Sequence, residues 1–223
     1  MTERLFKYWL AAFALSSFTY LLVRHFNWLP SMDWAPKIIP ILLLITYAAM
    51  SIQGRVRNLL LIGLSFSLLG DILLSLNGLF IHGLGAFLIA QLTYAALFIS
   101  QARISTSGFT FASIMVLLVG IAAWQILPQT ADLKWVVLAY MIAITTMAIS
   151  AGFRNDPAFL FTAIGAAIFV LSDTIIAINK FIAPFEWAGI GIMVTYYLAQ
   201  LMITLGVCRH SILQMREPHN ASA

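Results

Sequence analysis

Long apolar runs separated by short polar breaks cover almost the whole 223-residue sequence. Eight of these runs approach the roughly 20 residues that an α-helix needs to cross the hydrocarbon core of a bilayer. They predict helices at about residues 7–24, 36–52, 59–76, 82–100, 109–127, 134–151, 159–178 and 186–207. Because every break is short, we expect one transmembrane domain over residues 1–223, ending in a short polar tail at 211–223.

Two of the runs repeat each other around an aspartate. The segment from Gly63 to Asn77 matches the segment from Gly165 to Asn179 at a constant separation of 102 residues. The matched pairs are Gly63 with Gly165, Asp71 with Asp173, Asn77 with Asn179 and, one helix later, Tyr94 with Tyr196. Four matches at one separation indicate an internal repeat. We therefore expect an all-α membrane bundle of eight helices in two halves, about 1–105 and 106–210. The halves run parallel because each holds an even number of helices.

The composition agrees with a membrane-embedded chain. Of the residues, 62% are hydrophobic and 9% are charged, which leaves too few polar side chains to cover a soluble globule of this size. The basic residues are scattered through the breaks, which argues against a nucleic-acid-binding surface. Counted on alternate sides of the predicted helices, eight Lys and Arg residues accompany the two termini and four lie opposite. The positive-inside rule therefore predicts an integral protein of the cell (inner) membrane with both termini in the cytoplasm.

Asp71 and Asp173 are the strongest functional candidates, because each lies inside an apolar run. Burial of an ionisable side chain in the bilayer is costly, so such residues usually face the bundle interior and usually have a task. Gly63 and Gly165 precede the two acids by two helical turns on nearly the same face, where a neighbouring helix backbone can approach closely. We expect both carboxylates to point inward, toward each other, and to lie beyond the midplane. The alternative is that each acid only hydrogen-bonds a neighbouring helix.

Further polar residues in the predicted helices are candidates for the same site. Lys37 lies between Pro36 and Pro40 at the start of the second helix, where its ammonium can either snorkel to the interface or turn inward to an anion. A tyrosine inside a bundle needs a partner for its hydroxyl, which a backbone carbonyl or a site can supply. The candidate substrate-binding residues are Lys37, Asn77, Gln91, Tyr94, Tyr196 and Gln200.

Several kinds of catalytic machinery are missing from the sequence. The four histidines have no metal-ligand spacing, and the single cysteine, Cys208, excludes a cysteine-based zinc site, so we expect neither a metal nor another cofactor. There is no Gly-x-Ser-x-Gly motif either. Two carboxylates without a metal suit acid-catalysed cleavage through an oxocarbenium-like state, by which vinyl ethers and glycosides both break. Proton-coupled transport uses buried acids as well and is the alternative.

Short motifs in a fixed order resemble those of a known family. They are Pro36–Lys37, Gly70–Asp71, the stretch from Phe87 to Phe98 with Tyr94, Ser172–Asp173, and Tyr196–Tyr197 to Gln200. From the second to the eighth predicted helix, this pattern is similar to that of the YhhN-like membrane proteins, the lysoplasmalogenase family. The resemblance implies about eight helices and hydrolysis of the vinyl ether bond of lysoplasmalogens to a fatty aldehyde and glycerophosphoethanolamine or glycerophosphocholine. It also implies that Asp71 and Asp173 are catalytic and that Lys37 and Tyr94 line the site. Gln91 stands where the family pattern has histidine.

The mechanism expected from the two acids uses them in different states. One aspartate, protonated at rest, donates to the β-carbon of the vinyl ether, and the other stabilises the oxocarbenium ion and positions water. Lys37 is expected to hold the phosphate of the head group while the alkenyl chain lies among the helices. The expected partners are thus a lysophospholipid substrate and membrane lipids, with no obligate protein partner. A scaffold without catalysis is a third interpretation, against which the two buried acids argue.

Overall fold

The computed structural model describes residues 2–29, 32–154 and 159–220, with side chains described up to residue 211. Within these ranges, eight helices are long and apolar enough to cross a membrane, which confirms the predicted all-α fold class. They are α1 (Glu3–Phe26), α2 (Trp34–Ser51), α3 (Gly54–Ser75), α4 (Phe80–Ile99), α5 (Thr106–Ile126), α6 (Lys134–Gly152), α7 (Phe159–Ala177) and α8 (Ala188–Asn220). A π-helical segment, Ile178–Ile182, directly follows α7.

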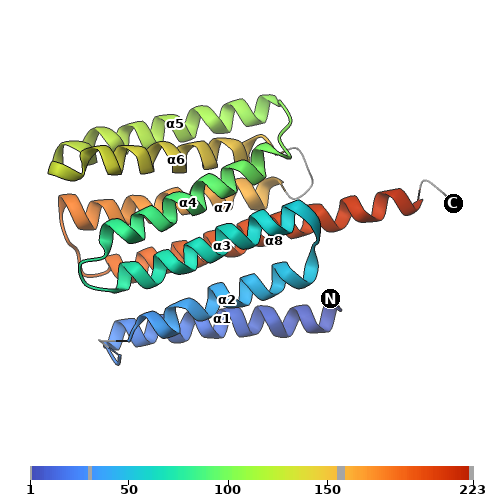
Figure 1. Ribbon diagram of the computed structural model, residues 1–223, viewed down its shortest axis with the longest axis horizontal. Coiled ribbons are helices and arrows are strands. Elements are labelled where there is room, and N and C mark those ends of the chain that lie inside the picture. The colour runs from blue at the N-terminus through green and yellow to red at the C-terminus, as the bar shows by residue number, and fades with distance from the viewer. Residues whose placement is uncertain (1, 30–31, 155–158, 221–223) are drawn as a thin grey trace.

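The helices run side by side in three groups (Figure 1). α3, α4, α7 and α8 lie in the middle, with the α1–α2 pair on one side and the α5–α6 pair on the other. α2 packs against α3 and α8, while α6 packs against α7 and α4. Each half of the chain thus contributes two central helices and one outer pair. The parallel repeat predicts such an arrangement, and the division into repeat halves stays a prediction.

The two largest differences from the predicted helix boundaries arise where polar residues continue a helix. α3 begins at Gly54 instead of about residue 59, so that Arg55 and Arg57 lie in its first turn. Long basic side chains can extend from a membrane helix to the aqueous boundary, so they do not end it. α8 runs to Asn220, past the predicted end at 207, because no glycine or proline interrupts the sequence from Val207 to Glu217. Residues 221–223 of the predicted polar tail lie outside the described residues.

Two glycines at equivalent repeat positions allow close packing in different ways. A Cβ atom on Gly165 would lie 3.0 Å from the backbone nitrogen of Ile203, so the bare backbone of α7 lets the α8 backbone approach closely, as predicted. A Cβ atom on Gly63 would clash with Cε1 of Tyr94. At Gly63 the missing side chain makes room for the ring of Tyr94.

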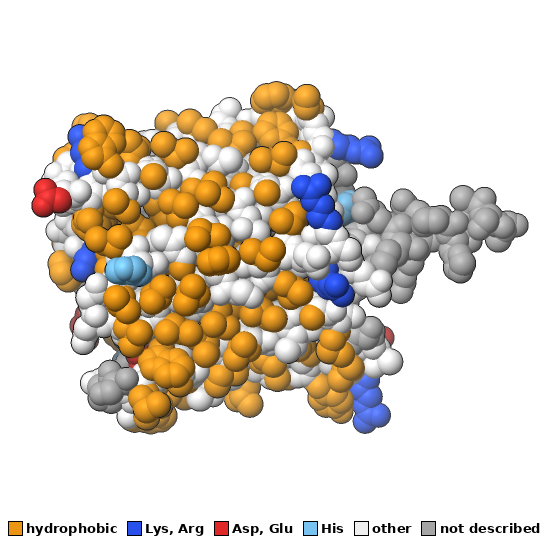
Figure 2. All heavy atoms as spheres, in the orientation of Figure 1, with side chains coloured by type: hydrophobic (Ala, Val, Ile, Leu, Met, Phe, Trp, Pro, Cys, Tyr) orange, Lys and Arg blue, Asp and Glu red, His pale blue; other side chains and the backbone are white. Residues whose placement is uncertain are grey.

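The lateral surface of the bundle is apolar, and the charges gather at its ends. Figure 2 shows hydrophobic side chains over the length of the helices, with Lys and Arg side chains toward the two ends. Leu15, Leu117 and Trp124 are examples of large apolar side chains that are exposed on this surface. The chain is therefore an integral membrane protein. α1 begins and α8 ends at the same end of the bundle (Figure 1), and which end faces the cytoplasm stays a prediction.

Candidate active site

Asp71 and Asp173 occupy equivalent places near the ends of α3 and α7. Each lies four residues before the last residue of its helix, Ser75 in α3 and Ala177 in α7. Because α3 begins earlier than predicted, Asp71 stands further along its helix than the sequence suggested. Among the hydrogen bonds and ion pairs of the described residues, none joins the two carboxylates, and each has partners of its own.

The Asp71 carboxylate is buried and bonded at both oxygens. Its Oδ2 accepts a hydrogen bond from the hydroxyl of Tyr196 in α8 at 2.7 Å, and its Oδ1 lies 3.4 Å from Nζ of Lys37 in α2. Nζ of Lys37 also donates to the backbone carbonyl of Asp71 at 3.1 Å and to Oγ of Ser75 at 3.3 Å. Lys37 therefore turns inward instead of snorkelling, and acceptors inside the protein match its three donors.

Polar contacts extend this network from α8 to α4. Nε2 of Gln200 lies 3.5 Å from the hydroxyl of Tyr196, and Oε1 of Gln200 accepts a hydrogen bond from the hydroxyl of Tyr94 at 2.9 Å. Side chains, not backbone carbonyls, thus satisfy both tyrosines. The hydroxyl of Tyr197 donates to the backbone carbonyl of Lys37 at 2.8 Å, which fixes α8 against α2 at this lysine.

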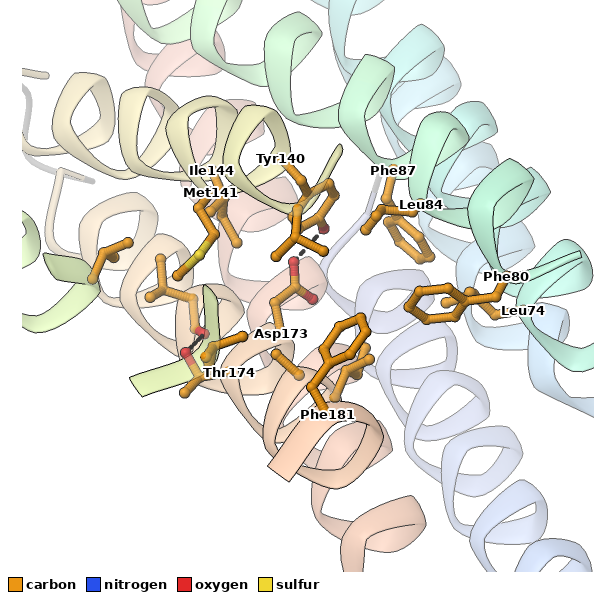
Figure 3. Close-up of a pocket in the computed structure, with 16 residues that line it drawn as sticks. Leu74, Phe80, Leu84, Phe87, Tyr140, Met141, Ile144, Asp173, Thr174 and Phe181 are labelled. Carbon is orange, nitrogen blue, oxygen red and sulfur yellow. Dashed lines mark hydrogen bonds between the residues drawn. The ribbon is translucent and has the colours of Figure 1, made fainter. Parts of the chain in front are cut away.

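Asp173 is half-buried and lies in an apolar environment. Its Oδ2 accepts a hydrogen bond from the hydroxyl of Tyr140 in α6. Figure 3 shows the carboxylate pointing into a cavity of about 670 Å³, its mouth included, which we call the apolar cavity. Thr174 also lines it, but its hydroxyl bonds back to the carbonyl of Val170. Asp173 and Tyr140 are therefore the polar groups that the lining of this cavity offers to a ligand.

A second cavity of about 710 Å³, its mouth included, adjoins the first, and we call it the charged cavity. Its polar lining comes from Tyr20, Arg24, Asp33, Lys37 and Ser75. Leu74, Phe80 and Ile176 line both cavities and so form the wall between them. Arg24 and Asp33, which both line the charged cavity, form an ion pair in which Nη1 of Arg24 lies 3.1 Å from Oδ2 of Asp33. An acid in an apolar chamber thus stands next to a chamber that holds three charged side chains.

The close packing of Phe87 explains why a glycine, Gly70, precedes Asp71 in the sequence. A Cβ atom on Gly70 would lie 2.5 Å from Cδ2 of Phe87, a residue that lines the apolar cavity. The ring of Phe87 meets the ring of Tyr196 edge-on, with centroids 5.8 Å apart, and Phe169 meets Tyr196 in the same way at 5.6 Å. Phe87 thus packs between the cavity and the tyrosine that binds Asp71, and a larger residue at position 70 would displace it.

Two predicted site residues do not join this network. Gln91 is fully buried in α4 beside the hydroxyl of Tyr140, but its amide meets the geometric limits of a hydrogen bond with none of the described residues. Asn77 is exposed in the turn between α3 and α4. Its repeat counterpart, Asn179, accepts a hydrogen bond from the backbone N–H of Phe185 at 3.1 Å. That contact shapes the connection to α8, which favours a role in the turn for this position.

Tyr140 is a site residue that the sequence did not single out. It is fixed by α6, the counterpart of α2, and it bonds Asp173 as Lys37 of α2 bonds Asp71. A separation of 102 residues from Lys37 leads to Ala139, the neighbour of Tyr140. Extending the repeat to the second helix of each half would therefore have pointed to this position.

The polar chemistry of the bundle thus comes from carboxylates, a lysine, tyrosines and glutamines. Within the described part of the chain, no group of three or more His, Cys, Asp or Glu residues is arranged to hold a metal ion. The fold and the site together define a polytopic α-helical membrane protein that holds two interior acids beside adjoining cavities. The YhhN family model matches residues 32–207, and the chain belongs to the YhhN family. This confirms the resemblance seen in the sequence.

Relatives with a stated activity carry the same name in bacteria and mammals. The chain is 31% identical over 207 residues to "Lysoplasmalogenase TMEM86B" of Sus scrofa, a match that covers 89% of this chain and 86% of the relative. It is 32% identical over 162 residues to "Lysoplasmalogenase" of Mycobacterium tuberculosis (strain CDC 1551 / Oshkosh), covering 69% and 61% respectively. It is 30% identical over 185 residues to "Lysoplasmalogenase TMEM86A" of Homo sapiens, covering 70% and 66%. No solved structure matches the chain.

Proposed function

We propose that the protein hydrolyses the vinyl ether bond of lysoplasmalogens and releases a fatty aldehyde and a glycerophospho head group. The relatives named lysoplasmalogenase support this substrate. The observation that carries the proposal is the apolar cavity, because it places an acid among apolar side chains of the kind that a hydrocarbon chain contacts. Its shared wall with the charged cavity suits a substrate that has an apolar chain at one end and a charged head group at the other.

Asp173 is the proton donor in this proposal. Its carboxyl faces apolar side chains, and among the described residues no Lys, Arg or His forms an ion pair with it. An ionised carboxylate without a partner is costly in such surroundings, which favours the protonated form at rest. Tyr140 holds the carboxyl in place and so acts as a positioning residue.

The reaction proceeds in two proton transfers at Asp173. Its carboxyl proton passes to the β-carbon of the vinyl ether, where the π electrons of the double bond form the new C–H bond. An oxocarbenium ion results, and water adds to its carbon while the Asp173 carboxylate takes up the released proton. The hemiacetal then collapses: its hydroxyl loses a proton, the glycerol oxygen gains one and leaves, and the aldehyde remains.

Asp71 is the ionised acid in this proposal. Its ion pair with Lys37 and its hydrogen bond from Tyr196 both favour the charged form. A negative charge on Asp71, held in the same bundle, also favours a cation formed beside Asp173. Asp71 therefore stabilises the oxocarbenium ion at a distance and fixes the lysine and the tyrosine that surround it.

Proton-coupled transport is the competing function, and the helices favour the enzyme. Carriers commonly interrupt the helices that hold their binding residues. α3 and α7 are continuous up to and beyond both acids, and the π-helical segment begins only at Ile178. Purified protein in proteoliposomes should therefore move no protons when lysoplasmalogen is added, as a pH-sensitive dye inside the vesicles would report.

We also propose that the protein lies in the cell membrane with both termini in the cytoplasm. The eight-to-four distribution of Lys and Arg supports this orientation. A fluorescent protein fused to the C-terminus should then fluoresce in cells, whereas an alkaline phosphatase fused there should be inactive. The opposite pattern would reverse the orientation.

The decisive test of the activity is aldehyde release by purified, detergent-solubilised protein in D₂O. Lysoplasmalogen should yield a fatty aldehyde that carries one deuterium on the carbon next to the carbonyl, because the proton that Asp173 delivers comes from solvent. Immediate trapping of the aldehyde as a hydrazone, followed by mass spectrometry, measures this. A lysophospholipid with a saturated ether, which has no double bond to protonate, is the control and should release nothing.

The same assay separates the mechanism from the activity. Asp71→Asn and Asp173→Asn should each stop aldehyde release, while Asp132→Asn, at an exposed aspartate between α5 and α6, should not. Aldehyde from a folded double variant of Asp71 and Asp173 would rule out the two-acid scheme. Well-folded wild-type protein that releases no aldehyde would rule out the activity.

A further inference from the structure

Arg24 presents one edge of its guanidinium to α8 without a bonded partner there. Nη1 bonds Asp33, and among the described residues no hydrogen bond engages the opposite edge, formed by Nε and Nη2. A Cβ atom on Gly189 would lie 3.1 Å from Nε and 3.3 Å from Nη2, so the missing side chain lets the guanidinium lie close over the first turn of α8. This edge is of the kind that binds phosphate oxygens in pairs.

The charges around this edge are mixed, and the positive ones outnumber the negative ones only on the side of the charged cavity: Glu186 lines another cavity with Arg24 and Gly189. Arg24, Lys37 and Gly189 all line the charged cavity. Among the described residues, the backbone N–H groups of Gly189 and Ile190, in the first turn of α8, have no backbone acceptor, and the positive end of the helix dipole lies there. The cavity also holds Asp33, so that a cationic and an anionic side chain stand 3.1 Å apart in it.

We propose that Arg24, with the first turn of α8, binds the phosphate of the lysophospholipid head group, and that Asp33, released from Arg24, accepts the head-group ammonium. This inference rests on the proposed function for its substrate and moves the phosphate from Lys37 to Arg24. The donors of Lys37 already have acceptors in Asp71 and Ser75. The paired charges of Arg24 and Asp33 complement those of a phosphoethanolamine or phosphocholine group.

Binding of a lipid that cannot be hydrolysed tests the proposal. The probe is radiolabelled 1-O-alkyl-glycerophosphoethanolamine, whose saturated ether resists protonation, measured on the full-length detergent-solubilised protein by scintillation proximity. Arg24→Gln should weaken its binding about tenfold or more, because a charge-assisted bidentate contact is lost. The same variant should bind 1-O-alkylglycerol, which has no phosphate, as wild type does.

A matched variant and a filled glycine sharpen this result. Lys134→Gln removes a positive charge at an exposed helix start outside both cavities, and should change neither affinity. Gly189→Val fills the space beside the Arg24 guanidinium and should weaken the phosphate-bearing probe selectively. If Arg24→Gln weakens both lipids equally, or neither, the phosphate site is overturned. The same holds if inorganic phosphate displaces the probe at equal concentration, because the site then takes free phosphate.

The role of Asp33 is tested as a ratio of affinities, which cancels any loss of folded protein. Asp33→Asn should weaken the ethanolamine probe relative to 1-O-alkyl-glycerophosphate, which lacks the ammonium, by about tenfold. An unchanged ratio would overturn the ammonium contact. If the protein releases aldehyde but the variants show none of these differences in probe binding, only the head-group site is contradicted. If the variants show the differences but the protein releases no aldehyde, only the proposed function is contradicted.

Discussion

The Asp71 and Asp173 sites occupy equivalent places in the two halves of the chain but differ in polarity and burial. Asp71 is 2% exposed and binds an ammonium and a phenol hydroxyl through its two carboxylate oxygens. Asp173 is half-buried, accepts one phenol hydroxyl and points into an apolar cavity. The outer helix of each half makes the difference, because α2 contributes Lys37 and α6 contributes Tyr140.

The difference teaches how a repeated element can supply two chemical roles. A carboxylate paired with a buried lysine is held in the ionised form, whereas one that faces apolar side chains favours the neutral form. An acid and a counter-charge are what cleavage through a cation requires. The hydrogen bonds of the two equivalent tyrosines add to the asymmetry. Tyr196 donates to Asp71, whereas its counterpart Tyr94 donates to Gln200 and not to Asp173.

The largest expected effect belongs to Asp173→Asn. This change keeps the shape but removes the proton that the reaction needs, so kcat should fall by about 10²–10⁴-fold, the usual contribution of a general acid. The free energy of unfolding should change little, because the amide still accepts the Tyr140 hydrogen bond. Aldehyde release and SDS-induced unfolding measure the two quantities. A large loss of stability with unchanged kcat would reverse the roles of the two acids.

Asp71→Asn should also stop aldehyde release but, unlike Asp173→Asn, should lower stability as well. It leaves the Lys37 ammonium buried without its counter-charge, which should lower the free energy of unfolding by about 3 kcal/mol. Adding Lys37→Gln to this variant should recover part of the stability, because the unpaired charge is gone, but should not recover aldehyde release. If the double variant is no more stable than Asp71→Asn, the ion pair is not what stabilises this region.

Two variants that each lose one tyrosine hydroxyl compare the Asp173 site with the Asp71 site. Tyr140→Phe removes the hydrogen bond that positions Asp173, so kcat should fall about tenfold while KM changes little. Tyr94→Phe removes a hydrogen bond to Gln200, which does not touch either acid, so its effect on kcat should be smaller. Steady-state kinetics of both proteins decide this. A greater loss of kcat in Tyr94→Phe would place the reactive group on the Asp71 side.

The smallest expected effect compares two fully buried glutamines. Gln91→Met removes an amide without hydrogen-bond partners and should leave stability unchanged or raise it by about 1 kcal/mol. Gln200→Met removes an amide that joins Tyr94 to Tyr196 and should lower stability by about 1–2 kcal/mol. SDS-induced unfolding of the pair measures the contrast. Equal losses would mean that Gln91 is as well bonded as Gln200.

Much of the fold followed from the sequence, because helix formation in a bilayer is a local matter. An apolar run of sufficient length must satisfy its own backbone in lipid, and so all eight helices were predicted. Their ends were predicted less well. Arg55 and Arg57 are polar and were assigned to a break, although polar residues at the membrane boundary continue a helix.

The candidate site was predicted by residue type but not by contact. The sequence singled out Lys37, Tyr94, Tyr196 and Gln200, which the structure joins to Asp71 in one network. It also singled out Asn77, which lies in an exposed turn. A polar residue is conspicuous in an apolar run, yet the sequence does not say which helix packs against it.

The sequence by itself determined the class of protein, its eight spans and the two acids, because hydrophobicity and the cost of burying a charge are properties of single segments. Only the tertiary structure decided that Lys37 meets Asp71, that Tyr140 meets Asp173, and that an apolar cavity adjoins a charged one. Those contacts depend on how the helices are rotated and which of them are neighbours. Side-chain packing between distant segments fixes both, and no local pattern encodes it.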